Sequence, residues 1–393
     1  MRADELYRSP NRLAPDYSAF RVADRLLLTG HSHQAWPDCA RDGQLRAWED
    51  AAELADEKWE RAFAQADRVR RGFAALLDDA DSEYALAPST HDLLLRFLSA
   101  LPLRDRPRLV TTDGEFNTIR RQLDRLGEEG IEIVRVAAGP ADTVAERLAA
   151  EITDRTAAVL VSAVFFHNAH IVSGLDQVAQ GCARFGAELL VDSYHALGVV
   201  PMSVPRQGLG GAFVTGGGYK YCQLGEGNCF LRIPPGRSFR PVVTGWFSEF
   251  SALAESRSTA VAYGRGADRF AGSTYDPTSH YRAADVFGFF EAQGLTPAFL
   301  REVSQHQIGR LADRFDALDL DPAVVTRDRT VPLEQLGGFL ALRAPDAGGL
   351  SRALRERGVL TDYRGDALRF GPAPYLADAQ LDAAMDLLGQ VAK

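Results

Sequence analysis

The stretch GGGYKY at residues 216–221 carries one of only three lysines in a chain with 44 basic residues. Lys58 belongs to a charged run with a helical pattern, and Lys393 is the last residue, whereas Lys220 lies among glycines and tyrosines. An amine can lose its proton and attack a carbonyl, but a guanidinium effectively cannot. Because arginine is used almost everywhere else, the stretch favours a Schiff-base lysine at Lys220 over a solvated surface lysine.

The preceding stretch AELLVDSYH, residues 187–195, ends a short apolar run in Asp192. Such a run is typical of a buried parallel strand that opens into a cleft. An unpaired buried carboxylate is costly, so Asp192 needs a partner. Pyridoxal 5′-phosphate (PLP) pairs its protonated ring nitrogen with an Asp and its aldehyde with a Lys. Asp192 alone fits a helix cap equally well, but Asp192 followed by Lys220 indicates PLP.

Composition narrows the class of protein. With 393 residues, the chain is long enough for about two or three domains, and its 46% hydrophobic and 25% charged residues are ordinary for a soluble protein. The net charge of −9 argues against a nucleic-acid partner. No apolar run approaches a membrane span or a signal peptide, and the four cysteines lack metal-site spacing. We therefore expect a cytoplasmic protein with free thiols, no metal and no membrane partner.

The middle of the chain alternates short apolar runs with helical patterns, which predicts a mainly parallel α/β sheet covered on both faces. Sites in such sheets gather at the carboxyl ends of strands. Ser89, Phe116, Asp192 and Lys220 all follow predicted strands. Before this region, the charged pattern predicts two helices, at about 48–63 and 66–77. From about residue 285 the pattern changes to that of a smaller α+β domain.

Three further groups of residues are candidates for the site. The pair Ser89-Thr90 opens an apolar helix, whose N-terminus suits either a phosphate or an ordinary cap. Phe116 is either a flat surface for a cofactor ring or a core phenylalanine. A loop after the short run 26–30 carries possible pocket residues, or residues of a packing loop: His31, His33 and Trp36.

Taken together, these residues resemble the class V aminotransferase group of fold-type-I PLP enzymes, and within that group kynureninase. The resemblance covers nearly the whole chain. Its anchors are DSYHALG (192–198), GYKY (218–221), GWF (245–247), RFAGST (269–274) and RFGPAPY (369–375). It implies a PLP-dependent transferase fold with three parts: an N-terminal segment, 1–40, packing on the active site; a large PLP-binding domain, 41–284; and a small C-terminal domain, 285–393.

The resemblance also implies roles for individual residues. Lys220 would form the internal aldimine, Asp192 would hold the pyridinium proton, and Phe116 would stack on the ring. His195 would lie close to the cofactor edge, and Arg369 would clamp the substrate α-carboxylate, a task that suits a planar bidentate donor.

The cofactor phosphate is implied to draw donors from two subunits. Within one chain the implied donors are Ser89, Thr90, Tyr219 and Trp246. Ser273 or Thr274 would reach the phosphate of the neighbouring subunit, which implies a homodimer with shared active sites.

The sequence departs from the kynureninase pattern at four places. These are the glycine run 224–228, the helix start 117–119 that lacks an acid, the segment 273–275, and the loop 165–168. The expected reaction is kynureninase-like hydrolytic cleavage of a Cβ–Cγ bond next to a ketone. Transamination or β-elimination on another amino acid is the first alternative, and a catalytically inert PLP-binding relic is the second. Desulfuration is disfavoured because no cysteine lies on an obvious glycine-rich loop.

Overall fold

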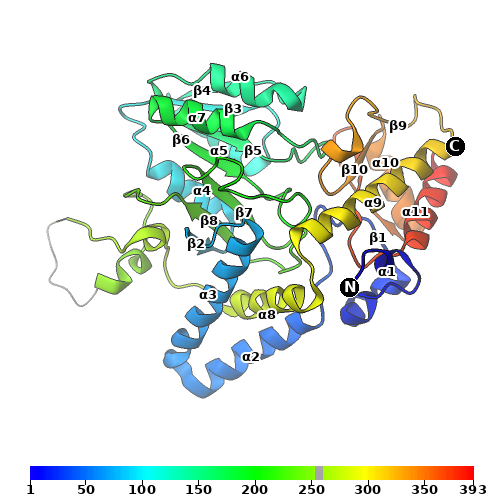
Figure 1. The fold of residues 1–393 in the computed structure, drawn as a ribbon, viewed down its shortest axis with the longest axis horizontal. Coiled ribbons are helices and arrows are strands. Elements are labelled where there is room, and N and C mark those ends of the chain that lie inside the picture. Colours follow the sequence, from blue (N-terminus) through cyan, green and yellow to red (C-terminus); the bar gives the residue numbers. More distant parts are fainter. Residues whose placement is uncertain (253–259) are drawn as a thin grey trace.

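The computed structural model describes residues 1–252 and 260–393. Its centre is a seven-stranded sheet, in which β8 runs antiparallel to both of its neighbours and all other adjacent strands are parallel (Figure 1). In sheet order the strands are β2 (Glu83–Ala87), β8 (Cys229–Ile233), β7 (Phe213–Gly217), β6 (Glu188–Asp192), β5 (Thr156–Ser162), β3 (Arg108–Thr112) and β4 (Glu132–Val136). The predicted mainly parallel α/β sheet is confirmed.

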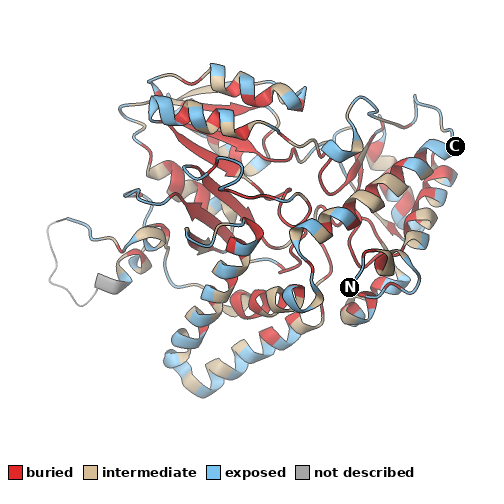
Figure 2. Ribbon diagram, viewed as in Figure 1, coloured by how far each residue is buried: buried red, intermediate tan, exposed pale blue. Residues whose placement is uncertain are grey.

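Helices cover both faces of this sheet because its central strands are apolar on both sides, as expected for parallel strands. All seven residues of β5 are buried. Val159 and Val161 belong to the core beneath α6 (Val144–Ala150) and α7 (Leu175–Phe185), and Leu160 belongs to the opposite core. The opposite core lies beneath α4 (Thr90–Ser99) and α5 (Asn117–Glu128). Figure 2 shows the buried sheet between the partly exposed helices.

The charged region before the sheet forms two helices, but not with the predicted bounds. Helix α2 runs from Cys39 to Leu54 and α3 from Lys58 to Leu76, so the helix predicted at 48–63 is wrong. Ala55 breaks the run because it adopts a positive φ of 53°. The break has neither Gly nor Pro to mark it, which is why the pattern does not reveal it. Helix α8 (Thr278–Gln293) packs on α2 and α3, and the boundary predicted after residue 284 falls within it.

The C-terminal part is a four-stranded antiparallel sheet with helices against it. Its strands, in sheet order, are β12 (Asp362–Arg364), β13 (Ala367–Phe370), β10 (Leu340–Arg343) and β9 (Thr326–Arg327). The helices of this part are α9 (Pro297–Ala317), α10 (Ala347–Glu356) and α11 (Asp378–Val391).

The N-terminal segment joins this C-terminal part. Strand β1 (Leu26–Leu27) pairs in parallel with β11 (Val359–Leu360), and α1 (Asp4–Tyr7) lies on the same side of the molecule as α11 (Figure 1). In the described residues, no helix is long and apolar enough to cross a membrane, and no group of three or more acidic, His or Cys side chains has the arrangement of a metal site.

Candidate active site

Lys220 lies in a cavity of about 220 Å³ at the carboxyl ends of β6 and β7, here called the Lys220 cavity. Its Nζ is 2.6 Å from Nε2 of His195, and both side chains are buried. Asp192, the last residue of β6, lines the same cavity and accepts a hydrogen bond of 2.9 Å from the backbone N–H of Tyr194. The structure therefore brings Lys220, Asp192 and His195 together.

The glycines before Lys220 are needed for close packing. A Cβ at Gly217 would lie 2.4 Å from the hydroxyl oxygen of Tyr194, and one at Gly218 would lie 2.4 Å from the side chain of Leu224. Real Cβ atoms essentially never approach so closely. The run of glycines therefore lets the turn that carries Lys220 pack directly against its surroundings.

Burial sets the protonation of these groups, because it disfavours whichever form is charged. It lowers the pKa of Lys220 well below its usual value, with the charge of Asp192 opposing this shift and that of Arg369 adding to it. Burial likewise raises the pKa of Asp192, and burial and the nearby charge of Lys220 lower the pKa of His195. The cavity thus favours a neutral amine, which is the nucleophilic form.

Aromatic rings surround the amine. Nζ of Lys220 is 4.9 Å from the ring centroid of Tyr194, 5.5 Å from that of Phe116 and 5.8 Å from that of Tyr219. Phe116 packs edge-on against Phe166 with centroids 5.3 Å apart, and both rings line the cavity. A flat cofactor ring would therefore find a face of Phe116 beside Lys220.

Helix α4 begins at the Lys220 cavity, where the phosphate was predicted to bind. Ser89 and Thr90 both line the cavity, as does His91 in the first turn, which the sequence analysis missed. The hydroxyl of Ser89 already caps the helix, since it accepts from the backbone N–H of Asp92 at 3.2 Å and donates to the carboxylate of Asp92 at 2.9 Å. The N-terminus of α4 suits an anion, but the negative charge of Asp92 in the first turn would repel one.

The cavity fits PLP in its polar groups. It offers a buried amine for the aldehyde and a partly buried carboxylate for the ring nitrogen, while the Nδ1 atom of His195 is buried without a hydrogen-bond partner. Its phosphate end is less complete, because among the described residues no arginine lines the cavity and Lys220 is the one lysine that does. The residues present therefore fit the cofactor, with phosphate donors still needed from elsewhere.

Glu115 is a buried acid beside the cavity that the sequence analysis did not single out. Its carboxylate accepts hydrogen bonds from the hydroxyls of Thr112 and Ser162, at 2.7 and 2.6 Å, and from the backbone N–H of Ser162 at 3.2 Å. Burial raises the pKa of Glu115 to about 7, although these hydrogen bonds lower it. The acid fastens the turn that carries Phe116 to the end of β5.

Arg369 is 3% exposed and does not line the Lys220 cavity. Its guanidinium donates to both carboxylate oxygens of Asp362 and to the backbone carbonyl of Phe166. Phe166 lines the cavity, so Arg369 lies directly behind its wall. The predicted contact with a substrate carboxylate stays a prediction.

The three residues of the predicted substrate loop lie in different surroundings. The His31 side chain is fully buried and bonds Asp362, so it has no surface for a substrate. His33 stacks on Tyr219, with centroids 4.8 Å apart, at the edge of the site. Trp36 packs under the guanidinium of Arg282 and does not line the Lys220 cavity. The prediction that His31 and Trp36 line the substrate pocket is therefore corrected, because packing uses both side chains.

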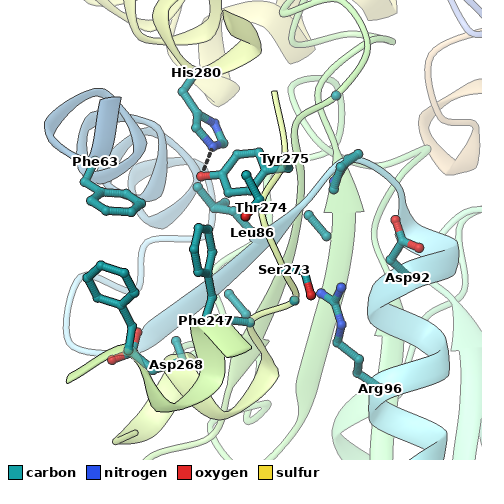
Figure 3. Close-up of a pocket in the computed structure, with 18 of the residues that line it drawn as sticks. Phe63, Leu86, Asp92, Arg96, Phe247, Asp268, Ser273, Thr274, Tyr275 and His280 are labelled. Carbon is teal, nitrogen blue, oxygen red and sulfur yellow. Dashed lines mark hydrogen bonds between the residues drawn. The ribbon is translucent and has the colours of Figure 1, made fainter. Parts of the chain in front are cut away.

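A second cavity, of about 430 Å³, adjoins the first and shares Pro88 and Gly227 with it. It holds none of the buried groups around Lys220, so we place the chemistry in the smaller cavity. Ser273 and Thr274 line this larger space, here called the Thr274 cavity, opposite the aromatic ring of Phe247 (Figure 3).

The Thr274 cavity is closed on one side by rings and on another by α4. Tyr275 bonds Nε2 of His280 at 2.8 Å, and Arg96 and Asp92 project from α4 (Figure 3). Trp246, in the 3₁₀ helix Trp246–Ala252, lines neither cavity and is 43% exposed. The prediction that Trp246 donates to the phosphate of its own chain is therefore corrected. Contact with a phosphate would need a second copy.

The fold defines the class of structure to which the chain is similar. It resembles a mutant of C-DES with glycine covalently linked to its PLP cofactor (TM-score 0.83, 14% identity, covering 97% of this chain and 99% of that one). It also resembles apo cysteine desulfurase from Thermococcus onnurineus NA1 (TM-score 0.78, 14% identity, 98% of both chains) and cysteine desulfurase CsdA from Escherichia coli (TM-score 0.76, 13% identity, 98% of both chains). The fold is that of the fold-type-I PLP enzymes, as predicted.

The C-terminal part carries a sequence match of its own. Residues 300–388 match the kynureninase C-terminal domain family. No curated protein sequence matches the chain. The predicted resemblance to the kynureninase-like members of the class V aminotransferase group is therefore confirmed by sequence in the C-terminal part, and the fold over nearly the whole chain is that of PLP enzymes.

Proposed function

We propose that the chain is a PLP-dependent enzyme acting on an amino acid, with Lys220 as the residue that binds the cofactor aldehyde. The observation that carries this proposal is that the buried amine of Lys220 and the carboxylate of Asp192 line one cavity of a fold-type-I structure. PLP, when bound, withdraws electrons from the bonds at the substrate Cα. Asp192 would hold the proton of the ring nitrogen, and the positive ring nitrogen would favour the charged carboxylate against the burial that raises the pKa of Asp192.

The residues around Lys220 support proton transfer at the substrate. Burial favours the neutral amine of Lys220, which accepts the Cα proton as a general base. Nε2 of His195 is 2.6 Å from this amine, within reach of the same proton. Phe116 and Tyr194 exclude water from one side of the amine. These contacts suit a site that moves protons between the substrate and one base.

The reaction that we favour is kynureninase-like hydrolysis of a Cβ–Cγ bond. Water adds to the γ-carbonyl carbon, the Cβ–Cγ bond breaks with its electron pair on Cβ, and Cβ takes up a proton. The products are a carboxylic acid and an amino acid with a shortened side chain. The match of residues 300–388 to the kynureninase C-terminal domain supports this choice.

Transamination or β-elimination on another amino acid is the alternative within the same site. It uses Lys220 and Asp192 in the same way, and C–S cleavage is named for one similar fold, the cystine C–S lyase C-DES. Desulfuration fits less well. Cys229 alone of the four cysteines lines the Lys220 cavity, and it lies on β8, where burial raises the pKa of its thiol to about 12.

We further propose that two copies complete each site. The phosphate end of the Lys220 cavity has an acid, Asp92, close to Ser89, and no arginine from the part of the chain that the structure describes. Large apolar side chains are exposed at residues 242–250 and at 261, and one of them, Phe250, lines the Thr274 cavity. A second copy would cover such side chains: Val242, Val243, Trp246, Phe250 and Val261. A homodimer that shares Ser273 or Thr274 between sites accounts for both features.

Two measurements test the proposed function. Borohydride reduction and peptide mapping of the protein loaded with PLP should place the pyridoxyl label on Lys220. A label on Lys58, or none, would end the PLP assignment. A panel of amino acids, followed by product mass and by the absorbance of the bound cofactor, separates hydrolysis from elimination and transamination. If every amino acid leaves both readouts unchanged, the chain is an inert PLP-binding relic.

A further inference from the structure

Arg369 is held on one edge by a single carboxylate. Its Nε and Nη2 atoms donate to the two oxygens of Asp362, at 2.9 and 2.6 Å, in a two-point contact. Nη1 donates to the carbonyl of Phe166 at 2.5 Å. Two-point contacts between a guanidinium and a carboxylate fix direction as well as distance. Asp362 therefore sets the plane and the heading of this guanidinium.

Asp362 is held in turn by His31. Nε2 of His31 lies 2.7 Å from the Asp362 oxygen that also receives Nε of Arg369. Burial lowers the pKa of His31 to about 4, so the neutral ring donates from Nε2. Phe339 packs against both partners, with its centroid 4.7 Å from that of His31 and 5.6 Å from the guanidinium carbon of Arg369.

The backbone leaves room for this arrangement only at glycine. A Cβ at Gly371 would lie 2.2 Å from Nδ1 of His31 and 2.6 Å from its backbone nitrogen. Any larger residue at this position would push the ring away from Asp362. The order Arg369-Phe370-Gly371 thus supplies both the guanidinium and the space for the histidine behind it.

The guanidinium keeps donors for a ligand. Of its five N–H groups, three are used by Asp362 and Phe166, and the terminal nitrogens hold the other two. We propose that Asp362, fixed by His31, is a positioning residue that presents these two donors of Arg369 to the carboxylate of the substrate. This inference rests on the proposed function, in which Arg369 takes that carboxylate.

The test compares two probes that differ only in the carboxylate: L-kynurenine and kynuramine. Their dissociation constants are measured on the PLP-loaded protein from the absorbance of the bound cofactor. The variants are Asp362→Asn, which keeps the shape but loses the charge, and Arg369→Lys, which tests the clamp itself. Asp366→Asn is the matched control, because Asp366 is an exposed acid between β12 and β13 that pairs with Arg343.

Asp362→Asn should raise the dissociation constant of L-kynurenine about tenfold, which corresponds to the loss of one charge-assisted hydrogen bond. It should leave the dissociation constant of kynuramine unchanged. Arg369→Lys should act in the same direction, and Asp366→Asn should change neither probe. If Asp362→Asn weakened the binding of both probes equally, the role of Asp362 would be structural only and the inference would be overturned. Tighter binding of L-kynurenine to Asp362→Asn would also overturn the inference, because it would mean that Asp362 competes with the substrate carboxylate for Arg369. If Arg369→Lys spares L-kynurenine, the clamp of the proposed function fails as well.

Discussion

Glu115→Gln should remove a dependence of stability on pH that the buried acid imposes. The side chain is 2% exposed, and burial raises its pKa from 4.5 to about 7. The folded protein therefore keeps a proton on Glu115 that the unfolded chain has already released. Stability from this group is fully present below pH 4.5 and is lost as the pH rises through about 7.

The glutamine is a close match in shape and bonding. Its oxygen can accept from the Thr112 hydroxyl and the backbone N–H of Ser162, as one Glu115 oxygen does now. Its amide can donate to the Ser162 hydroxyl, because a hydroxyl accepts as well as donates. The variant therefore removes the titration and keeps the contacts.

The magnitude follows from the shift in pKa. Between about pH 5 and pH 8, the free energy of unfolding of the wild type should fall by roughly 2–3 kcal/mol relative to Glu115→Gln. With about 2.1 cal/mol/K of unfolding entropy per residue, this corresponds to roughly 3 °C in Tm. Calorimetry at a series of pH values measures the difference between the two Tm curves.

A matched control is Glu128→Gln, since Glu128 lies at the end of α5 with 70% of its side chain exposed. That substitution should leave the pH dependence of Tm unchanged. Parallel Tm curves for the wild type and Glu115→Gln would refute the reasoning.

Three further substitutions test the proposed site. Asp192→Ala should retain some PLP but lose turnover by several orders of magnitude, because electrostatic stabilisation of a developing carbanion is a large term; near-normal turnover would leave Asp192 only as the cap of the turn at Tyr194. Mixing Lys220→Ala with Thr274→Trp should restore part of the activity in heterodimers, and a fully active monomer would contradict shared sites. Arg369→Lys should lower kcat/KM by ~10- to 100-fold, and an unchanged value for every amino acid would remove Arg369 from the site.

The proximity of Asp192 and Lys220 could be anticipated from the sequence because the topology leaves little choice. Their strands, β6 and β7, are neighbours in the sheet and parallel, so their carboxyl ends meet at one edge. Ser89 and Phe116 reach the same cavity for a related reason, as each follows a strand of this sheet. At these positions, the local sequence pattern and the rule that sites gather at the carboxyl ends of strands are sufficient to predict the cavity residues.

Other parts of the site could not be predicted in this way. Asp362 lies in a strand of three residues without an apolar pattern, and its partner His31 is 331 residues away in the sequence. Glu115 has an ordinary place in a turn, and only its burial between Thr112 and Ser162 makes it unusual. Pairs of this kind depend on packing between distant segments, for which local periodicity carries no signal.

Backbone hydrogen bonds join the N-terminal segment directly to the C-terminal part beside the site. The backbone N–H of Gly30 donates to the carbonyl of Gly371 at 2.7 Å, and the N–H of Gly371 donates to the carbonyl of Leu28 at 2.7 Å. A Cβ at Gly30 would lie 2.5 Å from the carbonyl oxygen of Pro372, so the two segments of the chain touch through their backbones.

This contact explains why the loop that carries His31 lies beside the strand that carries Arg369. Because β1 pairs with β11 and His31 bonds Asp362, the set of His31, Asp362 and Arg369 is held together by contacts between the N-terminal segment and the C-terminal part alone. The bond from Arg369 to the carbonyl of Phe166 crosses to the wall of the Lys220 cavity instead. A carboxylate that draws Arg369 toward Lys220 would therefore strain this bond first and leave the anchor at Asp362 intact.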